Sequence, residues 1–434
     1  MPSSRLSRRE LLQVSSLAAV PLVTARKRKA TGPQKDKLGT SFGAAQRGLR
    51  YKGLFMHAWD LRDDGIDEVM GWIRDSGLDT MCMAGTYHSG WFVHPHNSKH
   101  RAFMTEGSVC YFHPHAALYR GTRLRPVVSK VSAQTDWFAE ASKRLERFGL
   151  RMVSWTVGAH NTRLGLAHPE HTIRNVYGDS LPHALCPADD DVREYLKAIC
   201  RDLATNYAMW ALQLESFGWG VLAHGHHHQR DLTSLTALEQ ELAAMCFCPS
   251  CVRKAGAAGV DAGKAREVVK GVLDATFREA PDRPKGHPRS MPEREARSAE
   301  LKKFNAWREQ VPVSLVGEIK SAALKGTACR ILLQEGYDTE LARVTDGFAC
   351  WVYGKRPAES LEVCRAARAA CPPDWDGELQ CYVRLGMGVP ANEAELRAIV
   401  EAVRDGGCNG LNFYNRSEAP PKMLGWVKSA LAGI

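Results

Sequence analysis

A glutamate at the end of an apolar run is the strongest candidate for a catalytic residue. Residues 209–214 are mostly apolar, which is typical of a strand buried on both faces, and Glu215 follows them directly. Burying a carboxylate is costly unless the group is paired or used. In a parallel α/β barrel, the C-terminal ends of the strands carry the chemistry. We therefore predict a catalytic role for Glu215, with a structural ion pair as the alternative.

Glycosidic bond cleavage normally needs a second carboxyl group. Glu335 is the best second candidate, because it also follows a predicted buried strand and precedes a glycine. Asp60, which ends the first predicted strand, is the next candidate. The seventh predicted strand runs into Arg384 and Leu385 and offers no carboxylate.

Aromatic and imidazole side chains recur near the ends of the predicted strands. Aromatic faces stack on the apolar faces of sugar rings and suit a carbohydrate-binding site. The residues expected to contact substrate are Trp59, Tyr87, His88, Trp155, Trp219, His226, His227, Trp351, Tyr353 and Tyr414. Packing in the core or at the rim is the alternative for each residue taken singly.

Three cysteines form the sharpest local pattern in the chain. Cys246, Cys248 and Cys251 have C-x-C-x-x-C spacing, which brings three thiolates within reach of one ion such as zinc. Cys186 is the best fourth ligand, and a histidine from residues 224–228 is another. We therefore predict a structural zinc site and no organic cofactor. A disulfide with a free thiol, or unligated thiols, are the alternatives.

The histidines at 224 and 226–228 lie shortly after Glu215 and suggest a second kind of chemistry. Clustered imidazoles can bind a catalytic metal, contact substrate or shuttle protons. Helical metal-ligand spacings such as H-E-x-x-H are absent from this stretch. Substrate contact or loop packing is therefore favoured over a catalytic metal.

Eight apolar runs alternate with amphipathic segments and must position these residues. The predicted strands are residues 53–59, 78–84, 150–157, 209–214, 328–334, 347–353, 379–385 and 410–414. Predicted helices are residues 65–76, 135–148, 190–205, 339–345, 358–370, 393–405 and 420–431. This rhythm predicts an α/β protein, a (β/α)8 TIM barrel. An open doubly wound sheet is the alternative, although no glycine-rich dinucleotide fingerprint follows the first strand.

The barrel should occupy residues 51–434, with two long insertions. Residues 87–130 follow the second predicted strand and residues 216–327 follow the fourth. Both insertions leave strand C-termini, so both are expected to overhang the catalytic end of the barrel.

The N-terminal residues resemble a twin-arginine export signal. Arg8 and Arg9 precede an apolar segment, residues 11–23, that is too short to span a membrane. We predict a signal peptide over residues 1–25, a linker over 26–50, and a periplasmic or secreted protein. A basic arm before a short helix is the alternative.

Composition sets wider limits on function. The 434 residues carry a formal net charge of +10, but no stripe of arginine and lysine with interleaved aromatics, so no nucleic-acid partner is expected. No segment favours stable membrane insertion. The 13 cysteines are an odd number, which excludes complete internal disulfide pairing.

A strand-four glutamate followed by a C-x-C-x-x-C run resembles the β-galactosidases of glycoside hydrolase family 42. That resemblance implies an acid/base role for Glu215 and zinc ligation by Cys246, Cys248 and Cys251. The chain departs from that family in having Leu214 before the glutamate and no glutamate on strand seven. It is more similar to exported bacterial barrel proteins described as glycoside-hydrolase-like, which carry a Leu-Cys-Pro stretch, a Glu-Ser turn, a His-rich loop and a Cys-Phe-Cys cluster.

These patterns favour an exported glycoside hydrolase that uses two carboxylates on a carbohydrate substrate. A metal-dependent hydrolase acting through the His-rich loop is one alternative. A non-catalytic carbohydrate-binding barrel is the other, because fold does not imply function.

Overall fold

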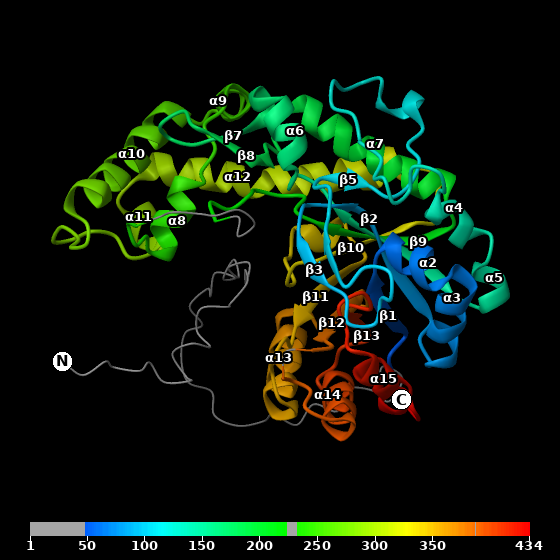
Figure 1. The fold of residues 1–434 in the computed structure, drawn as a ribbon. Helices are drawn as coiled ribbons and strands as arrows, with labels where there is room; N and C mark the ends of the chain where they lie inside the picture. Colours follow the sequence, from blue (N-terminus) through cyan, green and yellow to red (C-terminus); the bar gives the residue numbers. More distant parts are fainter. Residues whose placement is uncertain (1–47, 224–231, 387) are drawn as a thin grey trace, which may run out of the picture.

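Eight parallel strands form a closed barrel, which confirms the predicted (β/α)8 architecture (Figure 1). The computed structural model describes residues 48–223, 232–386 and 388–434. The barrel strands are β1 (Tyr51–Met56), β2 (Thr80–Tyr87), β6 (Arg151–Val157), β9 (Met209–Glu215), β10 (Arg330–Leu333), β11 (Gly347–Trp351), β12 (Glu378–Arg384) and β13 (Gly410–Tyr414). Each strand pairs with the next in this order, and β13 pairs with β1 to close the barrel.

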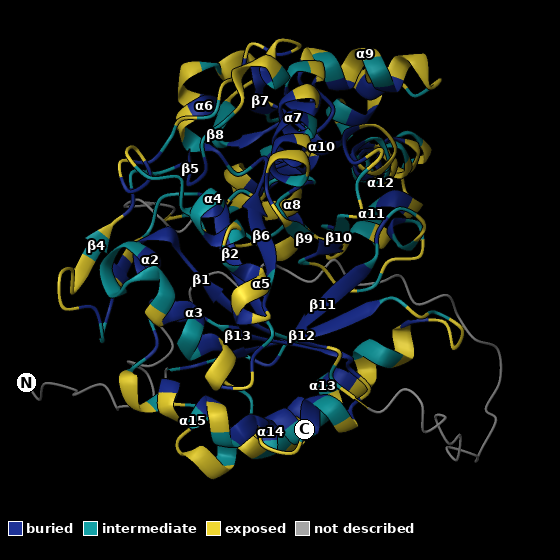
Figure 2. Cartoon of the chain, turned by 90° about the vertical axis from the view of Figure 1, so that its right-hand side faces the viewer, coloured by how far each residue is buried: buried dark blue, intermediate teal, exposed yellow. Residues whose placement is uncertain are grey.

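Helices cover the outside of the barrel and follow most of its strands (Figure 1). They are α2 (Ala58–Asp64), α3 (Ile66–Asp75), α4 (Trp137–Ser142), α5 (Leu145–Phe148), α7 (Asp190–Asn206), α13 (Pro357–Ala370), α14 (Glu393–Asp405) and α15 (Pro421–Leu431). Figure 2 shows the barrel strands buried and the outer faces of α14 and α15 exposed. None of the described helices combines the length and apolar composition that a membrane crossing requires.

Segments beyond the regular repeat leave the C-terminal ends of three strands. After β2 come the hairpin β3 (Trp91–Val93) and β4 (Ala102–Met104), and then β5 (Val109–Cys110), which pairs antiparallel with β2. After β6 come α6 (Thr162–Ala167), β7 (Thr172–Arg174) and β8 (Ser180–Leu185), a segment that sequence patterning did not reveal as an excursion.

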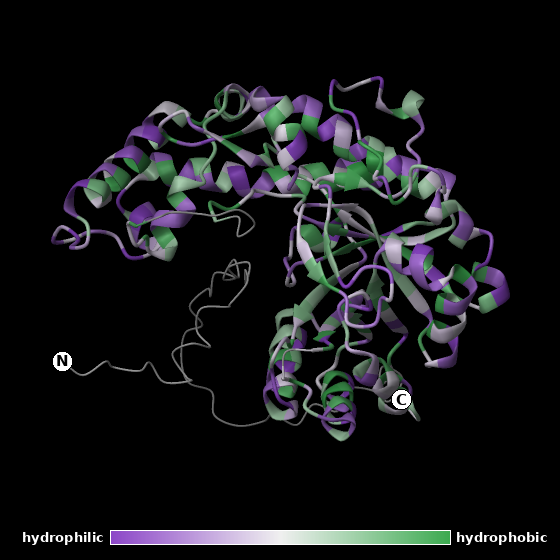
Figure 3. Ribbon diagram, in the orientation of Figure 1, coloured by the Kyte–Doolittle hydropathy of each residue, from purple (hydrophilic) through white to green (hydrophobic). Residues whose placement is uncertain are grey.

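The insertion after β9 is helical and carries its own apolar core. It contains α8 (Ala237–Ala243), α9 (Pro249–Ala257), α10 (Ala262–Glu279), α11 (Met291–Ala296) and α12 (Ala299–Glu318). Leu242, Val269, Leu273 and Phe304 are among its buried side chains. Figure 3 shows these helices with mixed hydrophobic and hydrophilic residues, as expected for helices that bury one face. The insertion extends away from the barrel as an arm (Figure 1).

Two local predictions differ from the structure. The first strand ends at Met56, and Asp60 lies in the first turn of helix α2 rather than at a strand end. His57 and Asp60 form a capping box, in which polar side chains satisfy the free backbone groups of a helix start. The predicted helix over residues 339–345 is a short 3-10 turn, Leu341–Arg343.

The register of the barrel decides which side chains point inward. Parallel partners share a face, and Trp155 is paired with Gln213 and Val157 with Glu215. Phe55 contacts the rings of both Trp155 and Tyr382 at centroid distances of 5.0 Å. Side chains from opposite walls therefore meet in the interior and fill it.

Glu378 is a buried carboxylate at the N-terminal end of β12. Its exposed fraction is 4%, and Arg330 Nη1 lies 3.8 Å from Oε2. Gly410 leaves room for it, since a Cβ there would lie 2.6 Å from Oε1. Burial raises the pKa of Glu378 to about 6, although the charges of Arg330, Arg50 and Arg151 oppose the rise.

This raised pKa predicts a stability that depends on pH. Folded Glu378 binds a proton more tightly than unfolded Glu378, so stability falls as pH rises from about 4.5 to about 6. Ionisation of buried Glu378 should lower the free energy of unfolding of the wild type by about 2 kcal/mol at neutral pH. Glu378→Gln has no carboxyl group to ionise at this position, so it should not show this loss. Urea unfolding across this range should show the difference, whereas the exposed control Glu362→Gln should follow the wild type. Parallel curves for wild type and Glu378→Gln would contradict the prediction.

Candidate active site

Glu215 is the last residue of β9 and lies half-buried at the C-terminal end of the barrel. The indole Nε1 of Trp155 donates a hydrogen bond of 2.6 Å to its Oε2. Its carbonyl accepts a 2.8 Å bond from the backbone N–H of Gly158, and Ser216 turns the chain with a positive φ of 59°. A non-glycine residue in this region is strained and is often found at functional sites. The carboxyl group is therefore held in a fixed position.

Four of the predicted substrate-contacting residues come together around Glu215. Trp155 packs against Tyr87 and Tyr414 at centroid distances of 4.7 and 5.8 Å, and Tyr353 lies 5.7 Å from Tyr414. Burial raises the pKa values of Tyr87 and Tyr353 well above the usual range, and the charge of Glu215 adds to this rise. These phenols therefore stay neutral and can donate hydrogen bonds near the carboxylate.

The other predicted substrate-contacting residues lie farther from this group. Trp351 contacts Tyr382, a ring that sequence patterning did not single out, at 5.9 Å. His88 stacks on Tyr87 at 4.3 Å, and Trp59, only 1% exposed, stacks behind His57. The remaining three are not placed at the site: Trp219 packs in the insertion with its Nε1 bonded to the carbonyl of Arg308, and His226 and His227 lie outside the described residues.

Asp60 is buried in a network of hydrogen bonds and charge. Its carboxylate accepts bonds from Arg416 Nη1 at 2.9 Å and from Ser417 Oγ at 2.5 Å. Burial alone would raise its pKa, but hydrogen bonding with His96 and the charge of Arg416 hold the pKa well below its usual range. Such a permanently ionised, paired carboxylate suits a structural role better than proton transfer.

Glu335 lies one residue out of line with Glu215. Leu333 pairs with Leu214, and the backbone N–H of Gln334 donates to the carbonyl of Leu214 at 3.0 Å. Alternation along the strand therefore puts Gln334 on the face of Glu215 and turns Glu335 to the other face. Glu335 is exposed, yet surrounding protein raises its pKa and the charge of Asp338 adds to the rise.

Glu418, which sequence reasoning missed, is a second carboxylate near the same tyrosines. Asn415 Nδ2 donates a 2.7 Å bond to its Oε1, and the residue is half-buried. Burial raises its pKa, although Asn415 and the charge of Arg384 oppose the rise. The charges of Glu418 and Glu215 both raise the pKa values of Tyr87 and Tyr414. Its one sequence signal is its place in the loop after the eighth strand.

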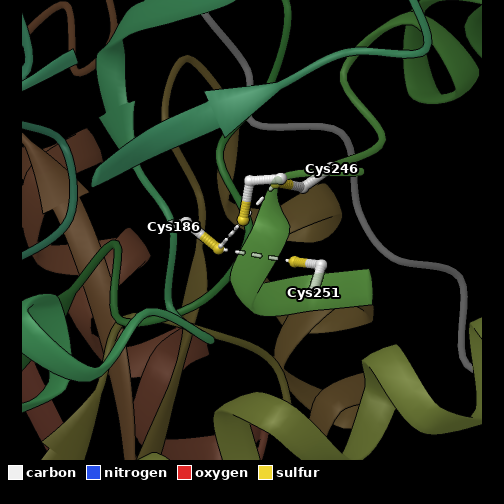
Figure 4. Close-up of side chains that lie close together, drawn as sticks. Cys186, Cys246 and Cys251 are labelled. Carbon is white, nitrogen blue, oxygen red and sulfur yellow. Dashed lines mark hydrogen bonds between the residues drawn. The ribbon is translucent and has the colours of Figure 1, made fainter. Parts of the chain in front are cut away.

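The four predicted cysteine ligands come together in one buried group, and Figure 4 labels three of them, Cys186, Cys246 and Cys251. Cys186 Sγ lies 3.5 Å from Cys251, 3.6 Å from Cys248 and 3.8 Å from Cys246. The positive charge of Arg308 lies close to three of these thiols. The group could hold one metal ion, and it would join the start of α9 to the loop that precedes α7.

The described acidic and histidine clusters are already neutralised by arginines. Asp60, Asp64 and His96 lie together, and Arg416 Nη1 contacts both carboxylates at 2.9 and 2.7 Å. In the cluster of His171, Asp189 and Asp191, Arg123 Nη2 lies 3.1 Å from Asp191, and His171 Nδ1 lies 2.8 Å from Asp189. Ion pairs within the protein therefore account for both clusters, and neither requires a metal ion.

Comparison with known proteins finds relatives in structure only. No protein-family model matches the sequence, and no curated protein matches it. The PgaB (BpsB) glycoside hydrolase domain of Bordetella bronchiseptica superposes with a TM-score of 0.55 at 11% identity, over 88% of this chain and 98% of that domain.

Two longer enzymes share the fold over part of their length. Alpha-L-fucosidase isoenzyme 2 from Paenibacillus thiaminolyticus gives a TM-score of 0.52 at 10% identity, over 88% of this chain and 49% of that enzyme. Beta-galactosidase from Bacillus circulans sp. alkalophilus gives a TM-score of 0.51 at 11% identity, over 90% of this chain and 56% of that enzyme. This chain thus spans about half the length of these two enzymes. At this identity, the likeness to glycoside hydrolases shows a common barrel fold.

The geometry of the four-thiol group around Cys186 predicts a metal-dependent arm. Cys248→Ser should remove one bound zinc per chain and loosen α9, because this thiol lies in the group and its residue stands at the start of that helix. Metal analysis and limited proteolysis should detect zinc loss and earlier cleavage within residues 232–327. Cys200→Ser is the matched control, since Cys200 is equally buried but outside the group. Unchanged zinc content and cleavage in Cys248→Ser would refute the site.

Proposed function

We propose that this protein is a glycoside hydrolase in which Glu215 is the acid/base. The supporting observation is the position of Glu215 at the C-terminal end of the fourth barrel strand, bonded to Trp155 and surrounded by buried tyrosines. Catalytic groups of (β/α)8 enzymes lie at this end of the barrel. The shared fold with glycoside hydrolases agrees with this proposal.

Glu215 would protonate the oxygen of the departing sugar. Trp155 holds Oε2, so Oε1 would face the glycosidic oxygen and deliver the proton. Trp155 and Tyr87 are buried and would support the site from within, whereas the half-buried rings of Tyr353 and Tyr414 would contact the sugar and their neutral hydroxyls would donate hydrogen bonds to it. Carbohydrate is therefore the substrate class.

Glu418 is our choice for the second carboxylate, with Glu335 as the alternative predicted from sequence. Glu418 and Glu215 act on the same two tyrosines, whereas the strand register turns Glu335 away from the face of Glu215. Glu418 would be the nucleophile if the carboxyl groups are about 5 Å apart and would activate water if they are farther apart. In both cases it must be ionised to act.

We also propose that the enzyme acts after export. The basis is the Arg8-Arg9 pair and the apolar segment over residues 11–23. These residues lie outside the described structure. Export in the folded state would suit a chain whose cysteines must be metallated before it meets an oxidising compartment.

A non-catalytic carbohydrate-binding barrel is the second candidate function. Strand β12, the seventh of the barrel, ends in Arg384, whose guanidinium lies 4.5 Å from the ring centre of Tyr353. A cation thus stands where the resembling family has its nucleophile. The same aromatic surface would then bind a sugar without cleaving it.

The role of Glu215 can be separated from a structural role. Glu215→Gln should lower kcat/KM on unactivated glycosides by about 100-fold to 10,000-fold, because the proton donor is lost. The loss should be much smaller on a dinitrophenyl glycoside, whose leaving group needs no proton. Rates on a panel of aryl glycosides and oligosaccharides measure this. Equal losses on both kinds of substrate would reject the acid/base assignment. Full activity of Glu215→Gln that a chelator abolishes would also reject it. Sugar binding by the wild type without turnover would support the second candidate function.

The second carboxylate has its own test. Glu418→Gln should abolish turnover of the dinitrophenyl substrate as well, while Glu335→Gln should retain it, because only Glu418 lies near the tyrosines around Glu215. The pKa of Glu418 is raised and the group acts when ionised, so the acid limb of kcat/KM should lie above the usual range for a glutamate. Loss of activity only in Glu335→Gln would exchange the two roles.

A further inference from the structure

A second group of four buried cysteines lies in the wall of the barrel. Its members are Cys350 on β11, Cys364 on α13, Cys381 on β12 and Cys408 in the turn between α14 and β13. Their exposed fractions do not exceed 7%. They come from four separate elements, and no short sequence motif joins them.

The barrel register directs these thiols toward one another. Cys350 and Cys381 are paired neighbours on adjacent parallel strands, so both point to the same face. That face is the outer one, because their neighbours Trp351 and Tyr382 contact each other inside the barrel. Cys364 is one of the buried residues of α13, the helix that follows β11.

The turn that carries Cys408 packs tightly on the same helix. A Cβ at Gly406 would lie 2.3 Å from the Cβ of Cys364, so only glycine allows this approach. Cys408 Sγ then lies 3.8 Å from Cys350 Sγ, and Cys364 Sγ lies 3.6 Å from Cys381 Sγ. The sulfurs of Cys350, Cys364 and Cys381 all lie within 4.8 Å of one another, and Cys408 joins them through its contact with Cys350.

The separations Cys364–Cys381 and Cys350–Cys408, 3.6 and 3.8 Å, match those around a single tetrahedral ion. With zinc–sulfur bonds of about 2.3 Å, the sulfurs of a tetrahedral site are about 3.8 Å apart. The group around Cys186 has the same spacing, 3.5 to 3.8 Å. We propose that Cys350, Cys364, Cys381 and Cys408 form a second structural zinc site, separate from the one around Cys186.

The arrangement favours an ion over disulfides. Two disulfides would join the thiols only in pairs, whereas here the sulfurs of Cys350, Cys364 and Cys381 all lie within 4.8 Å of one another and Cys408 contacts Cys350. A set of four buried cysteines also corresponds to the all-cysteine ligand set of closed structural zinc sites. The proposal does not depend on the catalytic activity of the protein.

An ion in this position would stabilise the two strands whose inward-facing rings lie at the proposed active site. Trp351 and Tyr382 follow Cys350 and Cys381 directly and point to the opposite face of the same strands. Fixing the two thiols would therefore fix the orientation of the two rings that line the barrel interior. The ion would also join α13 and the turn before β13 to these strands.

Metal content measured on the purified full chain tests the proposal. The wild type should contain two zinc ions per chain, and Cys364→Ser and Cys248→Ser should each contain one. The double variant should contain none. Cys371→Ser is the matched control, because Cys371 is buried near Cys350 but bonds to the carbonyl of Ala367 instead. Substitution by cobalt should give a thiolate charge-transfer absorption that either single variant halves.

Two outcomes would overturn the proposal, and the second needs only the wild-type protein, so it stands even if a variant fails to fold. If the wild type contains one zinc per chain, and Cys248→Ser loses this ion while Cys408→Ser keeps it, the second group is empty. Alkylation after denaturation without reductant should label all 13 cysteines. Protection of cysteines 350, 364, 381 and 408 in that experiment would show disulfides instead and reject the zinc site.

Discussion

Closure of the eight-stranded barrel by the pairing of β13 with β1 is the constraint on which the site depends. A closed parallel sheet has one register, and a shift by one residue would turn every side chain to the other face. On β11 and β12 this register sends Trp351 and Tyr382 inward and Cys350 and Cys381 outward. One set of backbone pairings thus serves both the proposed active site and the proposed metal site behind it.

The electrostatics at the barrel mouth follow from how little of it is open to water. Burial raises the pKa values of Tyr87, Tyr353 and Tyr414, so the proposed catalytic carboxylates are surrounded by neutral hydroxyl groups. Arg384, whose guanidinium lies over the ring of Tyr353, carries a positive charge and opposes the rise in the pKa of Glu418, whereas the charge of Asp60 adds to that rise. A low-dielectric site with few fixed charges strengthens the effect of each remaining charge.

Sequence patterns predicted the barrel well because apolar runs of strand length mark buried parallel strands, and all eight correspond to observed strands. They also predicted Cys186 as a companion of the C-x-C-x-x-C run. They failed at Asp60, where helix capping ended the strand early, and could not resolve the one-residue offset of Glu335. Glu418 was missed because a loop residue acquires its neighbours only through tertiary folding. Cys350, Cys364, Cys381 and Cys408 were missed for the same reason, since their spacing in the chain follows no local rule.

Each of the two cysteine groups connects chain segments that carry or flank residues of the proposed active site. The group around Cys186 joins α9, in the insertion after β9, to the loop before α7, the helix that leads into β9. With a bound ion it would clamp both chain segments that flank the strand carrying Glu215. An ion in the second group would clamp β11 and β12, whose strands also carry Trp351 and Tyr382 in the aromatic interior. A catalytic carboxylate and the rings around it must be held to within about 0.5 Å to be effective. Zinc ions in the two groups would supply that rigidity, one at the segments that flank β9 and the other at β11 and β12.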